Sequence, residues 1–281
     1  HLVALKAKKI KKVIIVQNKI DLISKEQAVK NYKDIKEFVK GTIAEDSPII
    51  PISAQQNVNL DKVLQEIVNV EIVKPEKNEA PLFLVARSFD INKPGTMLSE
   101  LHGGILGGAL KKGTLKIGDV IEIKPGHSSK KHGVYEYKTI TSKIVSMQKG
   151  NYPITEATPG GSLAIETELD PSLTKADSLS GSVASLEGAL PEISEKITIS
   201  YTLFGEVFGS GSHEEVAEFK MNELLMLSMN TTITVGKVVK VGKDSIELAL
   251  KIPVVPLKKE SIGIARNFGG HWRLIGFGEI I

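Results

Sequence analysis

Short runs of β-branched residues alternate with stripes of apolar residues at helical spacing over residues 1–70. The runs at Val13–Val16 and at residues 48–52 are each short enough for a central strand of a parallel sheet. A helix is predicted after each run, over residues 24–41 and 59–68, because apolar positions recur there every three or four residues. The stripes comprise Ala28, Tyr32, Ile35 and Val39 in the first helix, and Leu60, Val63, Leu64, Ile67 and Val68 in the second. This order predicts an α/β layer in which both helices pack on a sheet.

The ends of the predicted helices carry recognisable signals. Ser24, followed three residues later by Gln27, has capping-box spacing, and Gly41 stands where a C-terminal cap is expected. Leu2–Lys6 is typical of the last turns of another helix, and the lysines that follow complement its dipole. Because the sequence opens at His1 in such a segment, the chain is expected to start within a domain.

The pattern changes after residue 81. Residues 74–81 are polar, bounded by prolines and without periodicity, so a linker is predicted there. Beyond them, strand-like segments alternate with glycine and proline turns, which is the pattern of small antiparallel barrels or sandwiches. The predicted strands are Leu82–Phe89, Val120–Ile123, Lys138–Met147 and Ser162–Glu166, followed by Ile193–Leu203, Thr231–Val241, Ser245–Lys251, Ile262–Asn267 and Trp272–Phe277. We therefore expect three domains: an α/β domain over 1–76, and β domains over 77–188 and 189–281.

Composition narrows the class of protein. The 281 residues contain no cysteine, which excludes disulfides and thiolate metal sites. No apolar run approaches the roughly 18 residues that span a bilayer, and no signal peptide opens the sequence, so a cytoplasmic protein without membrane contact is predicted. The net charge is +3, and residues 1–75 hold 13 lysines against 9 acidic residues. Any nucleic acid must therefore be held by local patches rather than by a polybasic tail.

Three polar residues at the end of the first predicted strand suit a guanine base. Asn18, Lys19 and Asp21 fall at the carboxyl end of that strand, where open α/β sheets place ligands. The Asp21 carboxylate can accept two parallel hydrogen bonds, from guanine N1–H and the N2 amino group, whereas adenine offers an acceptor and a C–H there. The Lys19 stem can lie along the face of the base, and the Asn18 amide can bridge base and backbone. The alternative is an ordinary strand-to-helix turn with polar residues.

A second polar loop, Ser53–Gln55, follows the second predicted strand and precedes a helix. Right-handed crossovers place both loops at the same edge of a parallel sheet, so they are expected to lie together. The backbone N–H groups of Ser53 and Ala54 could then donate to guanine O6, a contact that the amino group of adenine cannot accept. The two loops together predict a guanine site more strongly than either one alone.

Other patterns match ligand sites less well. Gly103–Gly108 lacks the Lys and the Ser or Thr of a phosphate loop, so these glycines are predicted to allow close backbone approach, to another strand or to a ligand. Gly209–Ser212 is typical of a flexible loop and has no dinucleotide fingerprint. His127 and His132 stand in one loop without a third ligand nearby, so no metal site is predicted.

Four motifs resemble the gamma subunits of archaeal and eukaryotic translation initiation factor 2, which belong to the translational GTPases. These motifs are Ile14–Asp21, Pro51–Gln55, Ala86–Gly95 and Gly269–Gly276. The motifs of the β modules separate this family from elongation factor Tu, whose middle domain shares only the general pattern of Gly103–Ile123. The resemblance spans essentially the whole chain. It implies an α/β plus β fold: the C-terminal part of a P-loop-type GTP-binding domain, followed by two small β-barrel domains.

The resemblance also implies a function. Members of the family are GTP-dependent subunits of a heterotrimer that carries initiator methionyl-tRNA to the small ribosomal subunit. In them the GTP-binding domain contacts the beta subunit, while the first β module contacts the alpha subunit and the aminoacyl end of the tRNA. No residue for tRNA contact can be transferred by motif. The residues implied to bind the base of GTP or GDP are Asn18, Lys19, Asp21, Ser53, Ala54 and Gln55.

The 281 residues contain no counterpart of the family's phosphate loop, switch regions or zinc-knuckle cysteines. Without them the ligands of Mg²⁺ are absent and phosphoryl transfer has no machinery, so this polypeptide is expected to bind GDP weakly and not to hydrolyse GTP. Two alternatives stand beside an initiation GTPase. One is a nucleotide-independent module that holds tRNA or the alpha subunit, with a purely structural polar loop. The other is a selenocysteine-type elongation factor.

Overall fold

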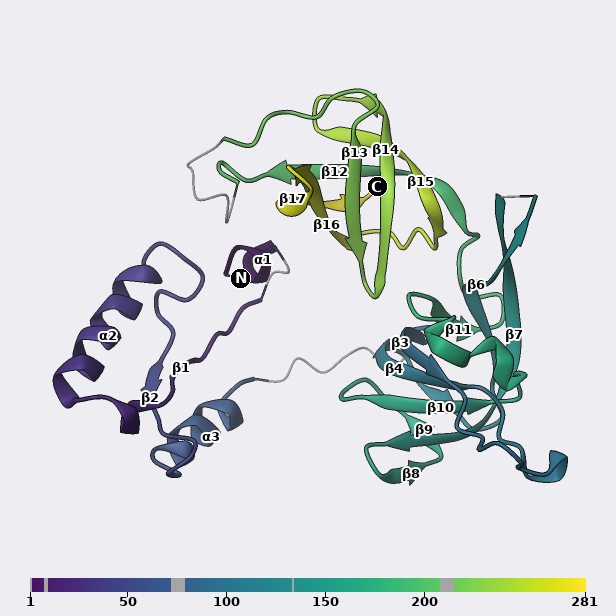
Figure 1. Ribbon diagram of the computed structural model, residues 1–281, viewed down its shortest axis with the longest axis horizontal. Coiled ribbons are helices and arrows are strands. Elements are labelled where there is room, and N and C mark those ends of the chain that lie inside the picture. The colour runs from purple at the N-terminus through teal and green to yellow at the C-terminus, as the bar shows by residue number, and fades with distance from the viewer. Residues whose placement is uncertain (1, 8–9, 72–78, 133, 208–214) are drawn as a thin grey trace. The chain divides into compact units, whose positions relative to one another are not determined.

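The computed structural model describes residues 2–7, 10–71, 79–132, 134–207 and 215–281. The chain divides into two compact units, His1–Lys74 and Pro75–Ile281, which are described separately (Figure 1). Most of the predicted linker, and the Gly209–Ser212 segment, lie outside the described residues. Among the helices in the described ranges, none has the length and apolar character needed to cross a bilayer.

The first unit has the predicted α/β order. Its elements are α1 (Leu2–Ala7), β1 (Ile15–Gln17), the 3₁₀ turn η1 (Ile20–Leu22), α2 (Lys25–Phe38), β2 (Ile49–Pro51) and α3 (Leu60–Val68). The two strands pair in parallel, with Ile15 opposite Ile49 and Gln17 opposite Pro51. Both strands therefore end at the same edge of the sheet, as predicted.

The start of α2 forms the predicted capping box. The Ser24 Oγ accepts a hydrogen bond from the Gln27 N–H at 3.3 Å, and the Gln27 Oε1 accepts one from the Ser24 N–H at 3.0 Å. The helix ends earlier than predicted, because Val39 is its C-cap. Gly41, with a φ of +72°, lies two residues beyond that cap and turns the chain away.

The two predicted apolar stripes differ in burial. Of the first stripe, Ala28, Tyr32 and Ile35 in α2 are half-buried, and Val39 at the C-cap is buried. In α3, by contrast, Leu64, Ile67 and Val68 are 62%, 52% and 81% exposed, although the stripe was predicted to pack. Helical periodicity shows which face is apolar, but it does not show whether another element covers that face.

The second unit contains two barrels built from short antiparallel strands. The strands of the first barrel region are β3 (Leu82–Phe89), β4 (Ile105–Lys112), β5 (Leu115–Lys116), β6 (Val120–Lys131), β7 (Val134–Lys149), β8 (Tyr152–Ile154), β9 (Glu156–Ala157), β10 (Leu163–Thr167) and β11 (Val183–Leu186). The order is β10-β4-β3-β11-β6-β7, closed by pairing of β10 with β7. Its interior is filled by alternate residues of these strands, among them the fully buried Phe83, Leu106 and Ile144.

Gly108 in β4 and Gly103 just before that strand allow close packing of neighbouring backbones. A Cβ added at Gly108 would lie 1.9 Å from the Leu84 carbonyl oxygen of β3, and one at Gly103 would lie 1.8 Å from the Thr167 carbonyl oxygen. Only glycine allows the backbones to approach this closely. The predicted role in close backbone approach is therefore confirmed for Gly103 and Gly108, whereas a Cβ at Gly107 would meet its nearest atoms at 3.5 Å.

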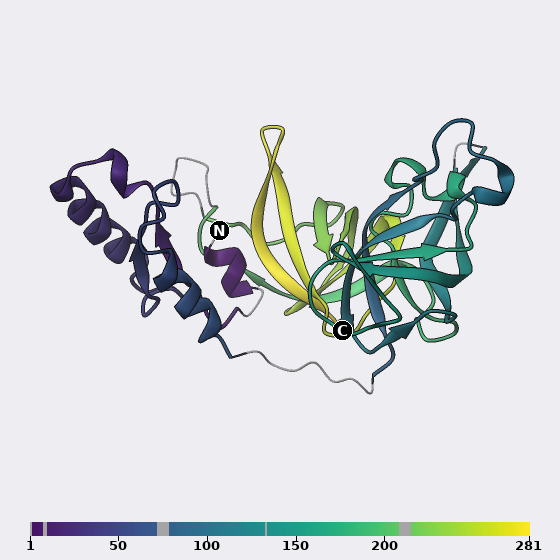
Figure 2. The same cartoon turned by 90° about the horizontal axis from the view of Figure 1, so that it is seen from below.

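The second barrel follows directly. Its strands are β12 (Ser194–Leu203), β13 (Leu224–Met229), β14 (Thr232–Val241), β15 (Ser245–Val254), β16 (Ser261–Phe268) and β17 (His271–Ile280). They close in the order β12-β15-β14-β13-β16-β17, with the long β16–β17 hairpin seen in yellow in Figure 2. The two barrels confirm the predicted fold class. The predicted domain limits at residues 76 and 188 stay predictions.

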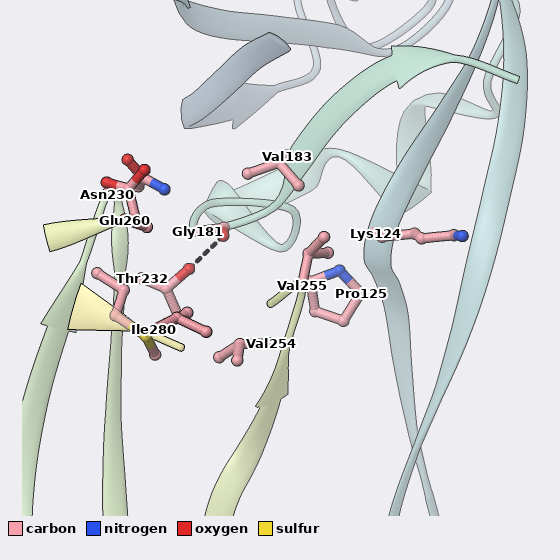
Figure 3. Close-up of a pocket in the computed structure, with 11 residues that line it drawn as sticks. Lys124, Pro125, Gly181, Val183, Asn230, Thr232, Val254, Val255, Glu260 and Ile280 are labelled. Carbon is pink, nitrogen blue, oxygen red and sulfur yellow. Dashed lines mark hydrogen bonds between the residues drawn. The ribbon is translucent and has the colours of Figure 1, made fainter. Parts of the chain in front are cut away.

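Specific contacts join the two barrels within this unit. The Thr232 Oγ1 of β14 donates a hydrogen bond to the Gly181 carbonyl oxygen, beside a small pocket between the strands (Figure 3). The buried Lys124 of β6 lies 3.4 Å from the Glu122 carboxylate and donates to the Leu190 carbonyl oxygen at 3.2 Å. These bonds fix the segment that leads from the first barrel into the second, because a buried ammonium must keep its partners.

Candidate functional site

The two polar loops of the first unit meet at the carboxyl ends of β1 and β2. The Ile52 N–H donates to the Gln17 carbonyl oxygen at 2.8 Å, and the Ile20 N–H donates to the Ile52 carbonyl oxygen at 3.2 Å. These bonds extend the parallel pairing beyond the strands. They bring the loop Asn18–Asp21 beside the loop Ser53–Gln55, as the sequence predicted.

The Asn18 side chain joins the loops directly. Its Oδ1 accepts hydrogen bonds from the Lys19 N–H at 2.8 Å and from the Ala54 N–H at 3.1 Å. Asn18 is nevertheless exposed, so a ligand can reach its amide. A short side chain with a carbonyl oxygen is needed here, because it must reach two backbone donors at once.

Lys19 turns the chain out of β1. Its φ of 68° and ψ of 32° lie in the left-handed region, which a non-glycine residue adopts at a cost of roughly 1–2 kcal/mol. The turn leads into η1, in whose first turn Asp21 lies. Both Lys19 and Asp21 are exposed, and both therefore remain available to a base placed over the loop.

Ser53 shapes the second loop from within. It is fully buried, its N–H donates to the Val58 carbonyl oxygen at 3.3 Å, and its Oγ accepts from the Gln56 N–H at 3.2 Å. The N–H groups of Ser53 and Ala54 thus both have protein acceptors in this conformation. A bond from either of them to a base oxygen would replace a bond seen here. Ala54 and Gln55 are exposed at the surface of the loop.

Gln17 supports the site and was not found from the sequence. It is 5% exposed, and its Nε2 donates to the Ala28 carbonyl oxygen and to the Asn31 Oδ1, both at 2.9 Å. The bonds hold α2 against β1 next to Asn18. The available signal was a polar amide in the last position of an otherwise apolar strand.

Potential metal ligands do not gather in the described part of the chain: no three His, Asp or Glu side chains there form a cluster that could hold a metal ion. The loops at the sheet edge contribute only one carboxylate, that of Asp21. The residues present therefore do not fit Mg²⁺, which needs oxygen ligands in octahedral geometry.

The Ala86–Gly95 motif forms a separate polar cluster on the first barrel. The Arg87 Nε donates to the Asp177 carboxylate at 2.8 Å, and the Ser88 N–H donates to the same carboxylate at 3.0 Å. The hydrogen bond from Arg87, and next that from Ser88, hold the pKa of Asp177 below its ordinary value. Asp177 has a φ of 59°, so the ion pair fixes a left-handed turn.

Comparisons with known proteins point to one family. Residues 195–280 match a family model described as initiation factor eIF2 gamma, C terminal. Translation initiation factor 2 subunit gamma of Methanococcus maripaludis strain S2 is 47% identical over 283 residues, covering 100% of this chain and 69% of that protein. The protein of the same name from Pyrococcus furiosus is 46% identical over 281 residues, covering 100% and 68%.

Solved structures show a similar fold. A bacterial selenocysteine-specific elongation factor EF-Sec superposes with a TM-score of 0.75 at 18% identity, over 98% of this chain and 40% of that chain. Elongation factor SelB from Methanococcus maripaludis, in complex with the GTP analogue GPPNHP, has a TM-score of 0.75 at 18% identity, over 100% and 61%. The chain thus spans less than two thirds of both structures. At this identity the likeness concerns the fold alone.

Proposed function

The chain belongs to the family of translation initiation factor 2 gamma subunits, and on this premise we propose that its paired loops bind the guanine base of GTP or GDP. The observation that supports the proposal is the hydrogen bond from the Ala54 N–H to the Asn18 Oδ1. It holds two loops with complementary polar groups at one sheet edge, where α/β sheets bind ligands. The base would lie between Asn18, Lys19 and Asp21 on one side and Ser53–Gln55 on the other.

Each residue has a distinct task in this proposal. The Asp21 carboxylate accepts from guanine N1–H and N2–H, which gives a bidentate contact worth roughly 1–3 kcal/mol of discrimination. The aliphatic stem of Lys19 covers one face of the base, and its left-handed backbone sets the turn that carries Asp21. Asn18 keeps the two loops together in the free chain, and guanine O6 takes the N–H of Ser53 or Ala54 in exchange for the bond which that group makes here.

We further propose that the chain acts in translation initiation, as part of a heterotrimer with alpha and beta subunits that delivers initiator methionyl-tRNA to the small ribosomal subunit. Identities of 46–47% with initiation factor 2 gamma subunits support this role. These identities favour an initiation factor over a selenocysteine-type elongation factor, because the evidence for the latter is only a similar fold at 18% identity. The alternative is a module that holds tRNA or the alpha subunit without any nucleotide, and an experiment must distinguish it from a GTP-dependent factor.

Base selectivity tests the site. Saturation-transfer NMR detects weak ligands, and it should report contact of the 281-residue chain with GDP but not with ADP at equal concentration. Asp21→Asn should abolish the GDP signal because it removes the bidentate acceptor, whereas Asp34→Asn, on the exposed surface of α2, should preserve it. Equal signals from GDP and ADP would overturn the guanine site.

Reconstitution tests the role in initiation. The chain is fused to the phosphate-loop and switch segments of a relative, which its 281 residues do not contain, and is combined with the alpha and beta subunits of that relative. Binding of initiator methionyl-tRNA is then measured with a GTP analogue, with GDP and without nucleotide. The proposal predicts the tightest binding with the GTP analogue. Equal binding in all three states would instead identify a nucleotide-independent module.

A further inference from the structure

The hairpin of β6 and β7 extends beyond its barrel as a two-stranded arm (Figure 1). Strand β11 pairs with β6 at residues 121–124, and β10 pairs with β7 at residues 144–149. Beyond these points, His127–Lys131 pair with residues 134–138 of β7. We call residues 127–132 and 134–138 the arm. Residues 127–132, Tyr135, Glu136 and Lys138 are exposed, so both faces of the outer part of the arm are open to a partner.

The arm turns away from the barrel at Gly126. This glycine has a φ of +84°, and a Cβ there would lie 2.2 Å from the Lys138 carbonyl oxygen. The register of β6 and β7 shifts between Ile123 and His127. Such bulges re-aim a strand, and here the bulge gives the arm a direction of its own.

The two faces of the arm differ in chemistry. Directly opposite residues of an antiparallel pair project from the same face, so Lys130 and Tyr135 share one face with Ser128 and Tyr137. We call this the tyrosine face. The Lys130 Nζ lies 5.8 Å from the centre of the Tyr135 ring, which is within cation–π range.

The opposite face carries charges of both signs. There the Lys131 Nζ lies 3.0 Å from the Glu136 carboxylate, and Lys138 faces His127. On the tyrosine face, by contrast, the described residues include a lysine but no acidic side chain. Tyr135 is 56% exposed, so an aromatic surface and an uncompensated cation lie side by side in solvent. A ligand that offers both a π-face and negative charge fits this pair.

A hollow at the base of the tyrosine face is lined by hydroxyl groups. Ser128 and Tyr137 of the arm line it together with Ser180 and Thr231, and its volume is about 210 Å³. That is below the roughly 300–1,000 Å³ of pockets for whole small molecules, so it suits one unit of a longer chain. The Thr231 Oγ1 is buried and finds no hydrogen-bond partner among the described residues. Hydroxyls both donate and accept, which matches a ribose 2′-OH.

From these observations we propose that the tyrosine face and the hydroxyl-lined hollow bind single-stranded RNA. A base stacks on Tyr135, Lys130 neutralises a neighbouring phosphate, and the hollow takes the ribose with its 2′-OH near Thr231. This combination of stacking platform and cation is the general mode of binding unpaired nucleic acid. The choice of natural RNAs for the test rests on the proposed role in initiation, whereas the RNA site itself is inferred from the residues of the arm and the hollow.

The test measures fluorescence anisotropy of a labelled oligouridylate with the 281-residue chain. Tyr135→Ala should weaken binding about 5- to 150-fold, as loss of one stacked base does, whereas Tyr135→Phe should retain it. Lys130→Ala should weaken binding and lower the slope of log affinity against log salt by about 1. Lys138→Ala is the matched control, because it removes the same charge from the opposite face and should change affinity far less.

The hollow is tested by comparing RNA with DNA. The chain should prefer the oligouridylate over the oligodeoxyuridylate of the same length, because only the former carries the 2′-OH. Thr231→Val keeps the shape of the side chain and removes a hydroxyl without a protein partner, so it should narrow this preference with little effect on folding. A preference unchanged in Thr231→Val would overturn the assignment of the hollow.

Three results would overturn RNA binding by the arm. The first is equal RNA affinity of wild type and Tyr135→Ala, and the second is an effect of Lys138→Ala as large as that of Lys130→Ala. The third is binding of polyglutamate rather than RNA through the same residues, which would identify an acidic protein as the partner. Competition of the labelled oligouridylate with initiator tRNA and with small ribosomal subunits shows which of these two natural RNAs the arm binds. Contact of GDP with Tyr135→Ala should remain normal, so failure of the guanine site and failure of the arm are separable.

Discussion

The Asn18 side-chain oxygen accepts the Ala54 N–H at 3.1 Å, across 36 positions of sequence. This bond lies at the edge where β1 and β2 both end, and it joins the loop that carries Asp21 to the loop that carries Ser53. The two halves of the proposed base site are therefore joined by an exposed side chain, in addition to the backbone bonds of Ile20 and Ile52. The two loops are thus held side by side before any ligand arrives, although a bond from the Ser53 or Ala54 N–H to the base would replace one seen here.

Replacing Asn18 should loosen the pair of loops. Asn18→Ala leaves the Lys19 and Ala54 N–H groups without this acceptor, at a cost of about 1 kcal/mol. Amide hydrogen exchange of Ala54 and Lys19 should accelerate by about fivefold, and GDP contact in NMR should fall. Gln55→Ala, in the same loop, should leave both exchange rates as they are. Unchanged exchange at Ala54 in Asn18→Ala would contradict the bridging role.

Lys19 should respond to substitution in two opposite ways. Glycine adopts a φ of 68° without strain, so Lys19→Gly should leave the free energy of unfolding unchanged or slightly raised. Lys19→Val should lower it by about 1–3 kcal/mol, because a β-branched residue is strongly disfavoured there. Both variants lose the stem that covers the base, and both should bind GDP less well. Urea unfolding of the first unit, followed by circular dichroism, measures the difference. If Lys19→Gly and Lys19→Val had equal free energies of unfolding, residue 19 would not adopt the left-handed conformation in solution.

Neighbouring glycines of β4 should tolerate alanine very differently. In Gly108→Ala the new Cβ would meet the Leu84 carbonyl oxygen at 1.9 Å, so strands β3 and β4 must separate, at a cost of about 2–4 kcal/mol. In Gly107→Ala the nearest atoms lie at 3.5 Å, which is an ordinary contact, so stability should change little. Thermal unfolding of the two variants checks this prediction. A Tm for Gly108→Ala as high as for Gly107→Ala would refute the close approach of the backbones.

The ion pair of Arg87 and Asp177 should make stability fall in acid. The pKa of Asp177 is lowered in the folded protein, by the hydrogen bond from Arg87 first and that from Ser88 second. Its contribution is therefore present above the unfolded pKa, near 3.8, and is lost as pH falls through the lower folded value. Asp177→Asn should reduce Tm at neutral pH, and the difference from wild type should shrink below about pH 4. Arg87→Gln should act in the same direction. A difference that grows in acid would have the wrong sign.

Sequence periodicity predicted the elements that are strongly patterned. The bounds of β3, Leu82–Phe89, were predicted correctly, because apolar residues fill that strand between clear turn signals. Strands β11 and β13 were missed. Strand β11 has only 4 residues, and in β13 apolar residues follow one another without polar alternation. The segment of the arm with His127 and His132 was predicted as a loop because glycine, serine and lysine dominate it, and only the pairing of β6 with β7 makes it a strand.

The candidate site was predicted in part. Motif and strand position placed the two loops at one edge, because parallel strands joined by helices leave no other arrangement. The sequence did not reveal that the Ser53 N–H is already used by the Val58 carbonyl oxygen, or that Gln17 anchors α2 beside the site. Both facts depend on side-chain and loop geometry, which no periodicity encodes. The exposed face of α3 was mispredicted for a similar reason, because burial depends on what surrounds a helix.

The most direct test of the guanine site is an exchange of base specificity at Asp21. The wild-type carboxylate accepts two hydrogen bonds from guanine. Xanthine carries a carbonyl oxygen, O2, where guanine carries the N2 amino group, and the side-chain amide of Asp21→Asn can donate a hydrogen bond to that oxygen. Saturation-transfer NMR with equimolar GDP and xanthosine diphosphate should show GDP preferred by wild type and xanthosine diphosphate preferred by Asp21→Asn. Wild type should bind GDP about 5- to 150-fold more tightly than xanthosine diphosphate, and Asp21→Asn should bind xanthosine diphosphate more tightly than GDP by a similar factor. If the preference is the same in both proteins, Asp21 does not read the base and the central claim is wrong.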